Sequence, residues 1–259
     1  MAAAVRMHVT ERGGNPQKST LFAFGGAGPV HAYHLAVKLG VPRMLVPLRA
    51  GVLSALGLVI APLAYDLVRT QKTPLAAVDP AHVDAVFREM TEEVALTLRK
   101  AEPDAAPTFA RAIDVGYIGQ GYQVTVPVGV GAAVATDALW ARFAEIYREK
   151  YGYFYDDVPA EIVNLRVSGK VGGRDIALAP MPRGTSSSAQ SRDSRPAFSA
   201  QRGRMVEFAI YDRSTLGPGA KLLGPAIVEE PSATTVIDVG GAVEVDAYGS
   251  LVVTVGAAS

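Results

Sequence analysis

A glycine-rich turn near the start of the chain is the segment best suited to bind a ligand. It consists of Gly25, Gly26, Ala27 and Gly28. Glycine tolerates positive φ and lets a ligand approach the main chain closely. A helix expected from residue 30 would point unpaired N–H groups at the turn, which could hold a phosphate or let an adenosine pack there. A tight strand-to-helix connection without a ligand is the alternative, and the pattern leaves both open.

Two histidines follow this turn. His31, on the first turn of the expected helix, could bind a phosphate oxygen or move a proton. A local hydrogen bond is the simpler alternative for it. His34 lies three residues on, and two histidines at this spacing could share a metal, but no third ligand is evident nearby. We therefore predict no metal site.

Three other segments could do chemistry or simply pack. Ser54 lies among small and apolar residues with no base beside it, so a packing role is favoured over a nucleophilic one. Tyr117 and Gln120 flank a glycine-rich bend that could aim them at a cleft or into an aromatic core. Glu229 and Glu230 form a carboxylate pair at the end of an expected strand, where a solvated edge is the default.

An aromatic cluster surrounds Gly152. Its members are Tyr147, Tyr151, Tyr153, Phe154 and Tyr155. Such a cluster could be a binding platform, but a core or a subunit contact is the favoured interpretation.

The elements that must position the glycine turn have an α/β pattern. A short apolar strand over 20–24 precedes the turn, a helix follows over 30–39, and a second strand follows over 43–47. A strand, helix and strand in this order form a βαβ-type unit, whose strands need neighbours along their edges. Few further strands are expected in residues 1–75, so the sequence points to a missing partner.

The rest of the chain has an α+β pattern. A capped amphipathic helix is predicted over 79–102, and a second helix over 137–151. Strands are predicted on either side of the second helix, and a series of short strands follows residue 203. Residues 183–203 are rich in serine, arginine and proline, which predicts a flexible loop. We therefore divide the chain into residues 1–75, a connecting helix over 76–107, and a C-terminal α+β domain over 108–259.

The composition of the chain argues against several kinds of partner and of chemistry. The 25 lysines and arginines balance the 25 aspartates and glutamates, which gives no reason to expect nucleic acid or an anionic membrane as a partner. There is no cysteine, so thiol catalysis, thiolate metal sites and disulfides are excluded, and a cytoplasmic protein is expected. No stretch has the pattern of a membrane span or a signal peptide.

Taken together, the motifs resemble the hydantoinase A/5-oxoprolinase family, which includes acetone and acetophenone carboxylase subunits. The matching segments are Phe24-Gly-Gly-Ala-Gly-Pro-Val-His-Ala32, Gly51-Val-Leu-Ser-Ala-Leu-Gly57, Asp66 with Arg69-Thr70, Gly119-Gln-Gly-Tyr122, Tyr151-Gly-Tyr153, Glu161-Ile-Val-Asn-Leu-Arg166, Tyr211-Asp-Arg213 and Gly224-Pro-Ala-Ile-Val-Glu-Glu230. Each is weak alone, and together they are specific. One departure is Gly116, where the family usually has an arginine before the tyrosine.

The resemblance implies a fold and an activity. The fold would be the C-terminal remnant of an actin-like ATPase (acetate/sugar kinase, Hsp70, actin) followed by a mixed, β-rich C-terminal domain. The activity would be ATP-driven hydrolysis of a cyclic amide; a ketone carboxylase subunit and a catalytically silent assembly subunit are the alternatives. Gly25, Gly26, Ala27, Gly28 and His31 would line the adenosine side of the nucleotide site, and the family's phosphate-binding segments have no counterpart in these 259 residues.

The resemblance also implies cofactors and partners. ATP and Mg²⁺ would be held largely by a partner chain, because phosphoryl transfer needs its charge neutralised. The partners would be an N-terminal hydantoinase A-type chain and a hydantoinase B-type subunit, and the substrate a small cyclic amide or ketone. The chain would therefore work as part of a multi-subunit hydrolase or carboxylase and be inactive alone.

Overall fold

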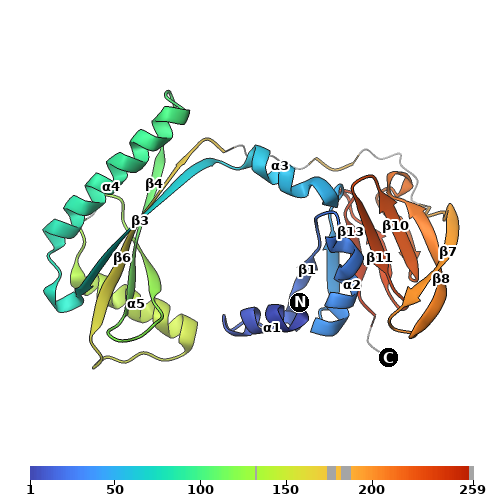
Figure 1. The fold of residues 1–259 in the computed structure, drawn as a ribbon, viewed down its shortest axis with the longest axis horizontal. Coiled ribbons are helices and arrows are strands. Elements are labelled where there is room, and N and C mark those ends of the chain that lie inside the picture. Colours follow the sequence, from blue (N-terminus) through green and yellow to red (C-terminus); the bar gives the residue numbers. More distant parts are fainter. Residues whose placement is uncertain (132, 174–178, 182–187, 257–259) are drawn as a thin grey trace. The chain divides into compact units, whose positions relative to one another are not determined.

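The computed structural model describes residues 1–131, 133–173, 179–181 and 188–256 (Figure 1). Its internal contacts divide the chain into two compact units. Unit 1 combines Met1–Val59 with Ile176–Ser259, and unit 2 is Ile60–Asp175. These units cut across the linear division expected from the sequence, because strands from the end of the chain pair with strands from its beginning.

The first sheet of unit 1 joins the two ends of the chain. Its strand order is β1 (Thr20–Phe22), β2 (Arg43–Val46), β13 (Leu251–Thr254), β12 (Ala242–Val245) and β9 (Lys221–Leu223). β1 and β2 are parallel, which confirms the predicted strand–helix–strand unit. The second neighbour of β2 is the antiparallel β13, so the chain itself covers that edge.

The second sheet of unit 1 has the order β11 (Ala233–Ile237), β10 (Ala226–Glu230), β8 (Arg204–Asp212) and β7 (Asp193–Ser199). β7 lies within residues 183–203, where a flexible loop was predicted, and that prediction is wrong for these seven residues. Their polar composition suits an exposed edge strand, and Pro196 is tolerated there. Residues 183–187 of the predicted loop lie outside the described residues.

Among the described residues, three α-helices belong wholly or mainly to unit 1: α1 (Ala2–Thr10), α2 (Gly28–Leu39) and α3 (Leu53–Ile60). α2 ends at Gly40, whose left-handed conformation at φ 69° closes the helix. Its buried side chains include Ala32 and Tyr33, which join the core shared with both sheets. This packing fixes the start of α2 beside β1.

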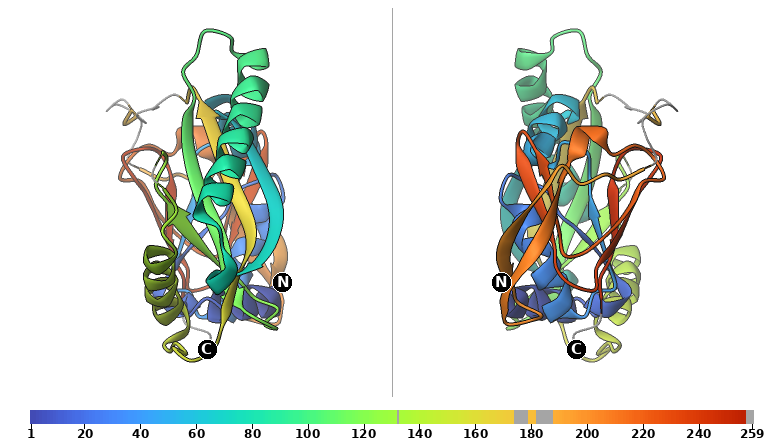
Figure 2. Two further views of the ribbon diagram at one scale, coloured as in Figure 1. Left: turned by 90° about the vertical axis from the view of Figure 1, so that its left-hand side faces the viewer. Right: turned by 90° about the vertical axis from the view of Figure 1, so that its right-hand side faces the viewer.

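Unit 2 is an antiparallel sheet with helices. The strand order is β3 (Leu63–Pro74), β6 (Ala160–Val171), β4 (Thr108–Tyr117) and β5 (Val124–Val128). α4 (Pro80–Ala101) lies along the sheet, as Figure 2 shows, and α5 (Thr136–Tyr151) contacts β5. Short 3₁₀ helices elsewhere in the described residues are Pro16–Lys18, Ala50–Val52, Leu75–Ala77 and Arg213–Thr215.

The predicted helix over 79–102 is confirmed in detail. Asp79 accepts a hydrogen bond from the Ala81 amide at 3.0 Å and so caps α4. The apolar stripe of α4 is buried, and its members are Val83, Phe87, Met90, Val94 and Leu98. α4 is thus part of the core of unit 2 and more than a connector. The long strand β3 was not predicted; its alternate residues are half-buried, as in a strand with one covered face.

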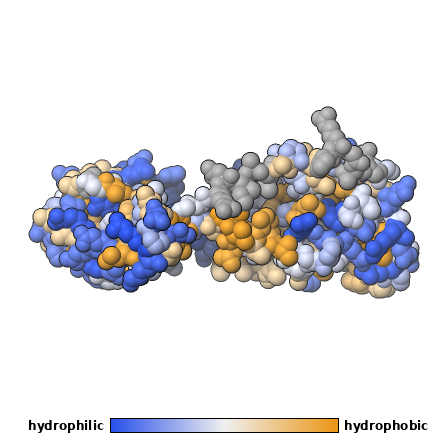
Figure 3. All heavy atoms as spheres, turned by 90° about the horizontal axis from the view of Figure 1, so that it is seen from above, coloured by the Kyte–Doolittle hydropathy of each residue, from blue (hydrophilic) through white to orange (hydrophobic). Residues whose placement is uncertain are grey.

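α3 is an apolar helix that buries none of its own residues within the described structure. Leu58 and Val59 are 81% and 77% exposed. Figure 3 shows an apolar patch, coloured orange, where α3 lies. Of the small residues expected to pack closely, Ala50 is buried and Gly51 lies against Ser232, whereas Ser54 on this helix is exposed. None of the described helices combines the length and the apolar character needed to cross a membrane.

Candidate functional site

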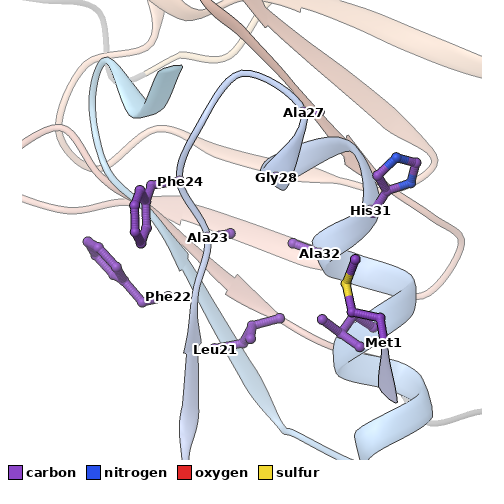
Figure 4. A pocket seen from close by; sticks show the side chains of 10 residues that line it. Met1, Leu21, Phe22, Ala23, Phe24, Ala27, Gly28, His31 and Ala32 are labelled. Atoms are coloured by element: carbon purple, nitrogen blue, oxygen red, sulfur yellow. The ribbon is translucent and has the colours of Figure 1, made fainter. Parts of the chain in front are cut away.

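The glycine turn borders an open pocket of about 290 Å³ in unit 1 (Figure 4). Nonpolar side chains from β1 and α2 form most of its wall, with His31 at one end. The lining residues are Met1, Leu21, Phe22, Ala23, Phe24, Ala27, Gly28, His31, Ala32 and Leu35. Ligand pockets for drug-sized molecules occupy roughly 300–1,000 Å³. The pocket is therefore at the lower end of this range, with a mainly nonpolar lining.

The glycines of the turn differ in what they require. Gly25 has φ 87°, a conformation that favours glycine, and its N–H donates to the Ala50 carbonyl at 2.8 Å. A Cβ on Gly26 would lie 3.4 Å from the Ser232 carbonyl oxygen, which is ordinary contact. A Cβ on Gly28 would meet no atom within 4 Å. Gly25 is thus required by its backbone conformation, whereas the lack of a side chain at Gly28 leaves open space at the pocket.

The segment around residues 49–51 contacts both the glycine turn and the turn between β10 and β11. Arg49 has φ 57°, and its N–H donates to Glu230 Oε2 at 3.0 Å. Gly51 lies so close to the turn between β10 and β11 that a Cβ there would be 2.0 Å from the Ser232 oxygen. Segments far apart in the sequence are therefore locked together behind the turn. The motif around Glu230 was the sequence signal for this contact.

The carboxylate pair at the end of β10 does more than form a solvated edge. Glu229 pairs with Arg192, and Arg195 Nη2 lies 3.4 Å from its Oε1. Near Glu230 lies Arg213, which is buried and donates to the Gly249 carbonyl. Burial lowers the pKa of Arg213 to about 10, although the negative charge of Glu230 acts in the opposite direction. The default interpretation of this pair from the sequence is therefore corrected.

The two histidines on α2 lie in different surroundings. His31 is exposed and lines the pocket. His34 Nε2 lies 2.8 Å from Oδ2 of the buried Asp238, which also accepts a hydrogen bond from Ser199. Burial opposes ionisation of Asp238, but the hydrogen bonds from His34 and Ser199 hold its pKa below the usual value. Asp238, which follows β11, thus joins α2 to the β7–β8 turn. No group of metal-ligating side chains occurs among the described residues.

In unit 2, the segment after β4 is part of a core. Tyr117 is buried against Phe143 and Tyr147, and its hydroxyl donates to the Tyr155 carbonyl at 3.1 Å. Gln120 donates to the Tyr147 hydroxyl at 3.0 Å. Of the two alternatives left open by the sequence, the aromatic core contact is the one observed. Gly116 also has a structural reason, because a Cβ there would lie 3.0 Å from the Tyr122 carbonyl oxygen.

The aromatic cluster is partly core and partly surface. Tyr147 is buried, whereas Tyr153 and Tyr155 are about half exposed, with their rings 5.2 Å apart. The favoured interpretation as a core holds for Tyr147. The exposed rings leave a surface that a partner could contact.

A buried network in unit 2 was missed by reasoning from the sequence. Asp114 is fully buried and accepts hydrogen bonds from Thr125, Asn164 and Arg166 at 2.7–2.9 Å. Asn164 in turn accepts a hydrogen bond from Thr70 at 2.9 Å. The available signal was the segment from Glu161 to Arg166, which the resemblance singled out without a role.

Comparison with known families gives this architecture its class. The hydantoinase/oxoprolinase model matches residues 1–67, and the hydantoinase/oxoprolinase C-terminal domain matches residues 76–252. The second match alone covers more than half of the chain. The protein belongs to the hydantoinase/oxoprolinase family, as the motifs indicated.

Individual relatives agree. The chain is 32% identical over 258 residues to protein MJ0964 of Methanocaldococcus jannaschii. This match covers 97% of this chain and 35% of the relative. It is 26% identical to the acetone carboxylase beta subunit of Xanthobacter autotrophicus, over 91% of this chain and 35% of that subunit. The structure of the ATP-dependent caprolactamase from Pseudomonas jessenii superposes with a TM-score of 0.75 at 22% identity, over 98% of this chain and 38% of that chain. The chain thus spans little more than a third of the length of these relatives.

Proposed function

We propose that this chain supplies the adenosine-side wall of the nucleotide site in an ATP-dependent enzyme of this family. The observation that carries the proposal is the open pocket at the glycine turn, lined by Ala27, Gly28 and His31 together with apolar side chains of β1 and α2. Gly25 and Gly26 precede these residues in the turn and do not line the pocket themselves. Its size and nonpolar walls suit a purine ring, and the exposed main chain from Gly26 to Gly28 allows a ligand to come close.

The same proposal assigns the phosphate and Mg²⁺ contacts elsewhere. The described residues contain no acidic cluster that could hold a metal ion. The relatives have almost two thirds of their length outside the match. We therefore place the phosphate-binding segments, in an actin-like ATPase fold, in that remainder, with a hydantoinase B-type subunit as a further partner.

The proposed reaction is ATP-driven C–N hydrolysis of a cyclic amide. ATP would supply the phosphoryl group that turns a carbonyl oxygen into a good leaving group. Carboxylation of a ketone, activated in the same way, is the second candidate, and the similarity to an acetone carboxylase subunit favours it. Comparing turnover of a lactam and of a ketone with bicarbonate by the assembled enzyme decides between them.

The nucleotide role is tested by Gly28→Val in the assembled complex. The new Cβ meets no atom within 4 Å, and Gly28 lines the pocket, so the added side chain is directed into open space rather than into the core. We expect ATP affinity to fall by roughly 10- to 100-fold, about 1–3 kcal/mol, with an unchanged melting temperature. The matched control is Gly121→Val, at an exposed glycine of unit 2 that also has open space around it. Unchanged affinity of the Gly28 variant, measured by calorimetry on intact complex, would refute the role.

A further inference from the structure

Two residues that flank β11 contact the two elements that build the pocket. Before the strand, the Ser232 carbonyl oxygen lies 3.4 Å from the place that a Cβ on Gly26 would take. After the strand, Oδ2 of Asp238 lies 2.8 Å from Nε2 of His34 on α2. α2 also packs against β11 itself. One strand of the second sheet therefore borders both the glycine turn and the helix that follows it.

Asp238 is held in place by donors from three segments of the chain. It is fully buried, and removing a carboxylate from water is unfavourable unless hydrogen bonds compensate. Besides His34, the donors are the Ser199 hydroxyl and the N–H groups of Ala200 at 2.9 Å and Val239 at 2.7 Å. Although burial opposes ionisation, hydrogen bonds from His34 and Ser199 lower the pKa of Asp238. An ionised carboxylate only accepts hydrogen bonds, so His34 Nε2 is the donor to it.

His34 links this carboxylate to the helix that forms one wall of the pocket. Gly28, His31 and Leu35 line the pocket and lie three and four residues apart, so they share one face of α2 (Figure 4). His34 lies about 100° around the helix from Leu35, outside that face. A turn of α2 about its axis would displace the pocket face, and the contact between His34 and Asp238 opposes such a turn.

We propose that Asp238 and His34 are positioning residues of the nucleotide site. Together they fix the orientation of α2 and thereby the place of Gly28 and His31 in the pocket wall. The inference rests on the proposed function, in which this wall receives the adenosine. Neither Asp238 nor His34 lines the pocket, so both act through α2 and not by touching the ligand.

The test replaces His34, whose side chain is 32% exposed, and leaves the buried carboxylate in place. His34→Ala removes the donor to Asp238, whereas His34→Gln keeps a side-chain N–H donor. The matched control is His82→Ala, at an exposed histidine on α4 of unit 2. ATP affinity is measured by calorimetry on the assembled complex, the melting temperature on the same samples, and KM and kcat from phosphate release.

We expect His34→Ala to raise the Kd and KM for ATP by roughly 3- to 30-fold, the usual range for a residue that acts on a site through another element. The kcat at saturating ATP should not change, because a displaced adenosine wall weakens binding without moving the phosphates. His34→Gln should recover most of the lost affinity, and His82→Ala should behave like the unmodified complex. A purely structural contact would instead lower the melting temperature and leave the ATP affinity of intact complex unchanged.

Unchanged ATP affinity in His34→Ala would overturn the inference. If Gly28→Val still weakens ATP binding, only the positioning role fails; if neither variant changes the affinity, the nucleotide role falls with it. Equal losses in His34→Ala and His34→Gln would also overturn the inference, because the donor to Asp238 would then not matter. In the double variant with Gly28→Val, the effect of His34→Ala should shrink, since both changes act on one wall; fully additive effects would contradict a shared route.

Discussion

At the scale of single residues, the site depends on glycines that face other backbone atoms. Gly25 needs its positive φ, whereas Gly51 needs the absence of a side chain, because the Ser232 carbonyl occupies the space of a Cβ. Glycine is therefore required at these two positions for different reasons, one conformational and one steric. The sequence shows where the glycines are, but only the contact with a strand turn some 180 residues away explains Gly51.

We predict that Gly51→Ala lowers the free energy of unfolding by about 1–3 kcal/mol, the usual cost of forcing extra atoms into a packed site. The physical reason is the 2.0 Å approach of the new Cβ to the Ser232 oxygen. Gly57→Ala in α3 is the control, since its Cβ meets nothing within 4 Å. That variant should gain up to about 1 kcal/mol from helix propensity. Denaturant unfolding compares the two, and equal stability would contradict the proposed steric role of Gly51.

At the scale of elements, Asp114 ties the sheet of unit 2 together. Its carboxylate accepts from Thr125 on β5 and from Asn164 and Arg166 on β6, and Asn164 extends the network to Thr70 on β3. Burial acts to raise the pKa of Asp114, but hydrogen bonds from Arg166, Asn164 and Thr125 outweigh it and lower the pKa. The ionised carboxylate therefore stabilises the fold.

We predict that Asp114→Asn destabilises the protein by about 1–3 kcal/mol at pH 7, a range that allows for the partial exposure of Arg166. Because the folded pKa is lowered, the contribution of Asp114 is fully present above the unfolded pKa of about 3.9 and is lost as the pH falls through the folded pKa. The difference between the two proteins should therefore shrink as the solution is acidified below pH 4. Unfolding curves at several pH values measure it. Asp104→Asn, at an exposed position, should show no such trend.

At the scale of the whole molecule, each unit leaves surfaces that its own residues do not cover. In unit 1 these are the β1 edge and the apolar α3. In unit 2, Tyr153 and Tyr155 are exposed. Exposed apolar surfaces of this kind are typical of sites where another protein binds.

We predict that the 259-residue chain alone shows no Mg²⁺-dependent ATP turnover. The pocket wall is largely nonpolar and holds no lysine or arginine to contact phosphates, and no acidic cluster is present among the residues that the structure describes. Phosphate release by the purified chain should equal that of the Gly28→Val variant, which serves as the background. Turnover above that background would show that this chain itself holds the phosphates.

The sequence by itself determined many of the local elements and the family. The spacing of apolar residues predicted α4 and its Asp79 cap, because helix periodicity and capping depend on neighbours within one turn. The motifs between residues 24 and 230, each weak alone, were together enough to identify the family, which the matches confirmed. β7 escaped prediction because an edge strand has little apolar burial to mark it.

Only the tertiary structure decided which distant segments meet. The pairing of β13 with β2, the contact of Gly51 with Ser232, and the burial of Asp114 each join residues far apart in the chain. Such contacts depend on how sheets close and which main-chain edges meet, and local residue patterns do not encode these relations. For the same reason, the open outer edge of β1 is recognised only from the complete strand order, in which no described strand pairs with that side of β1.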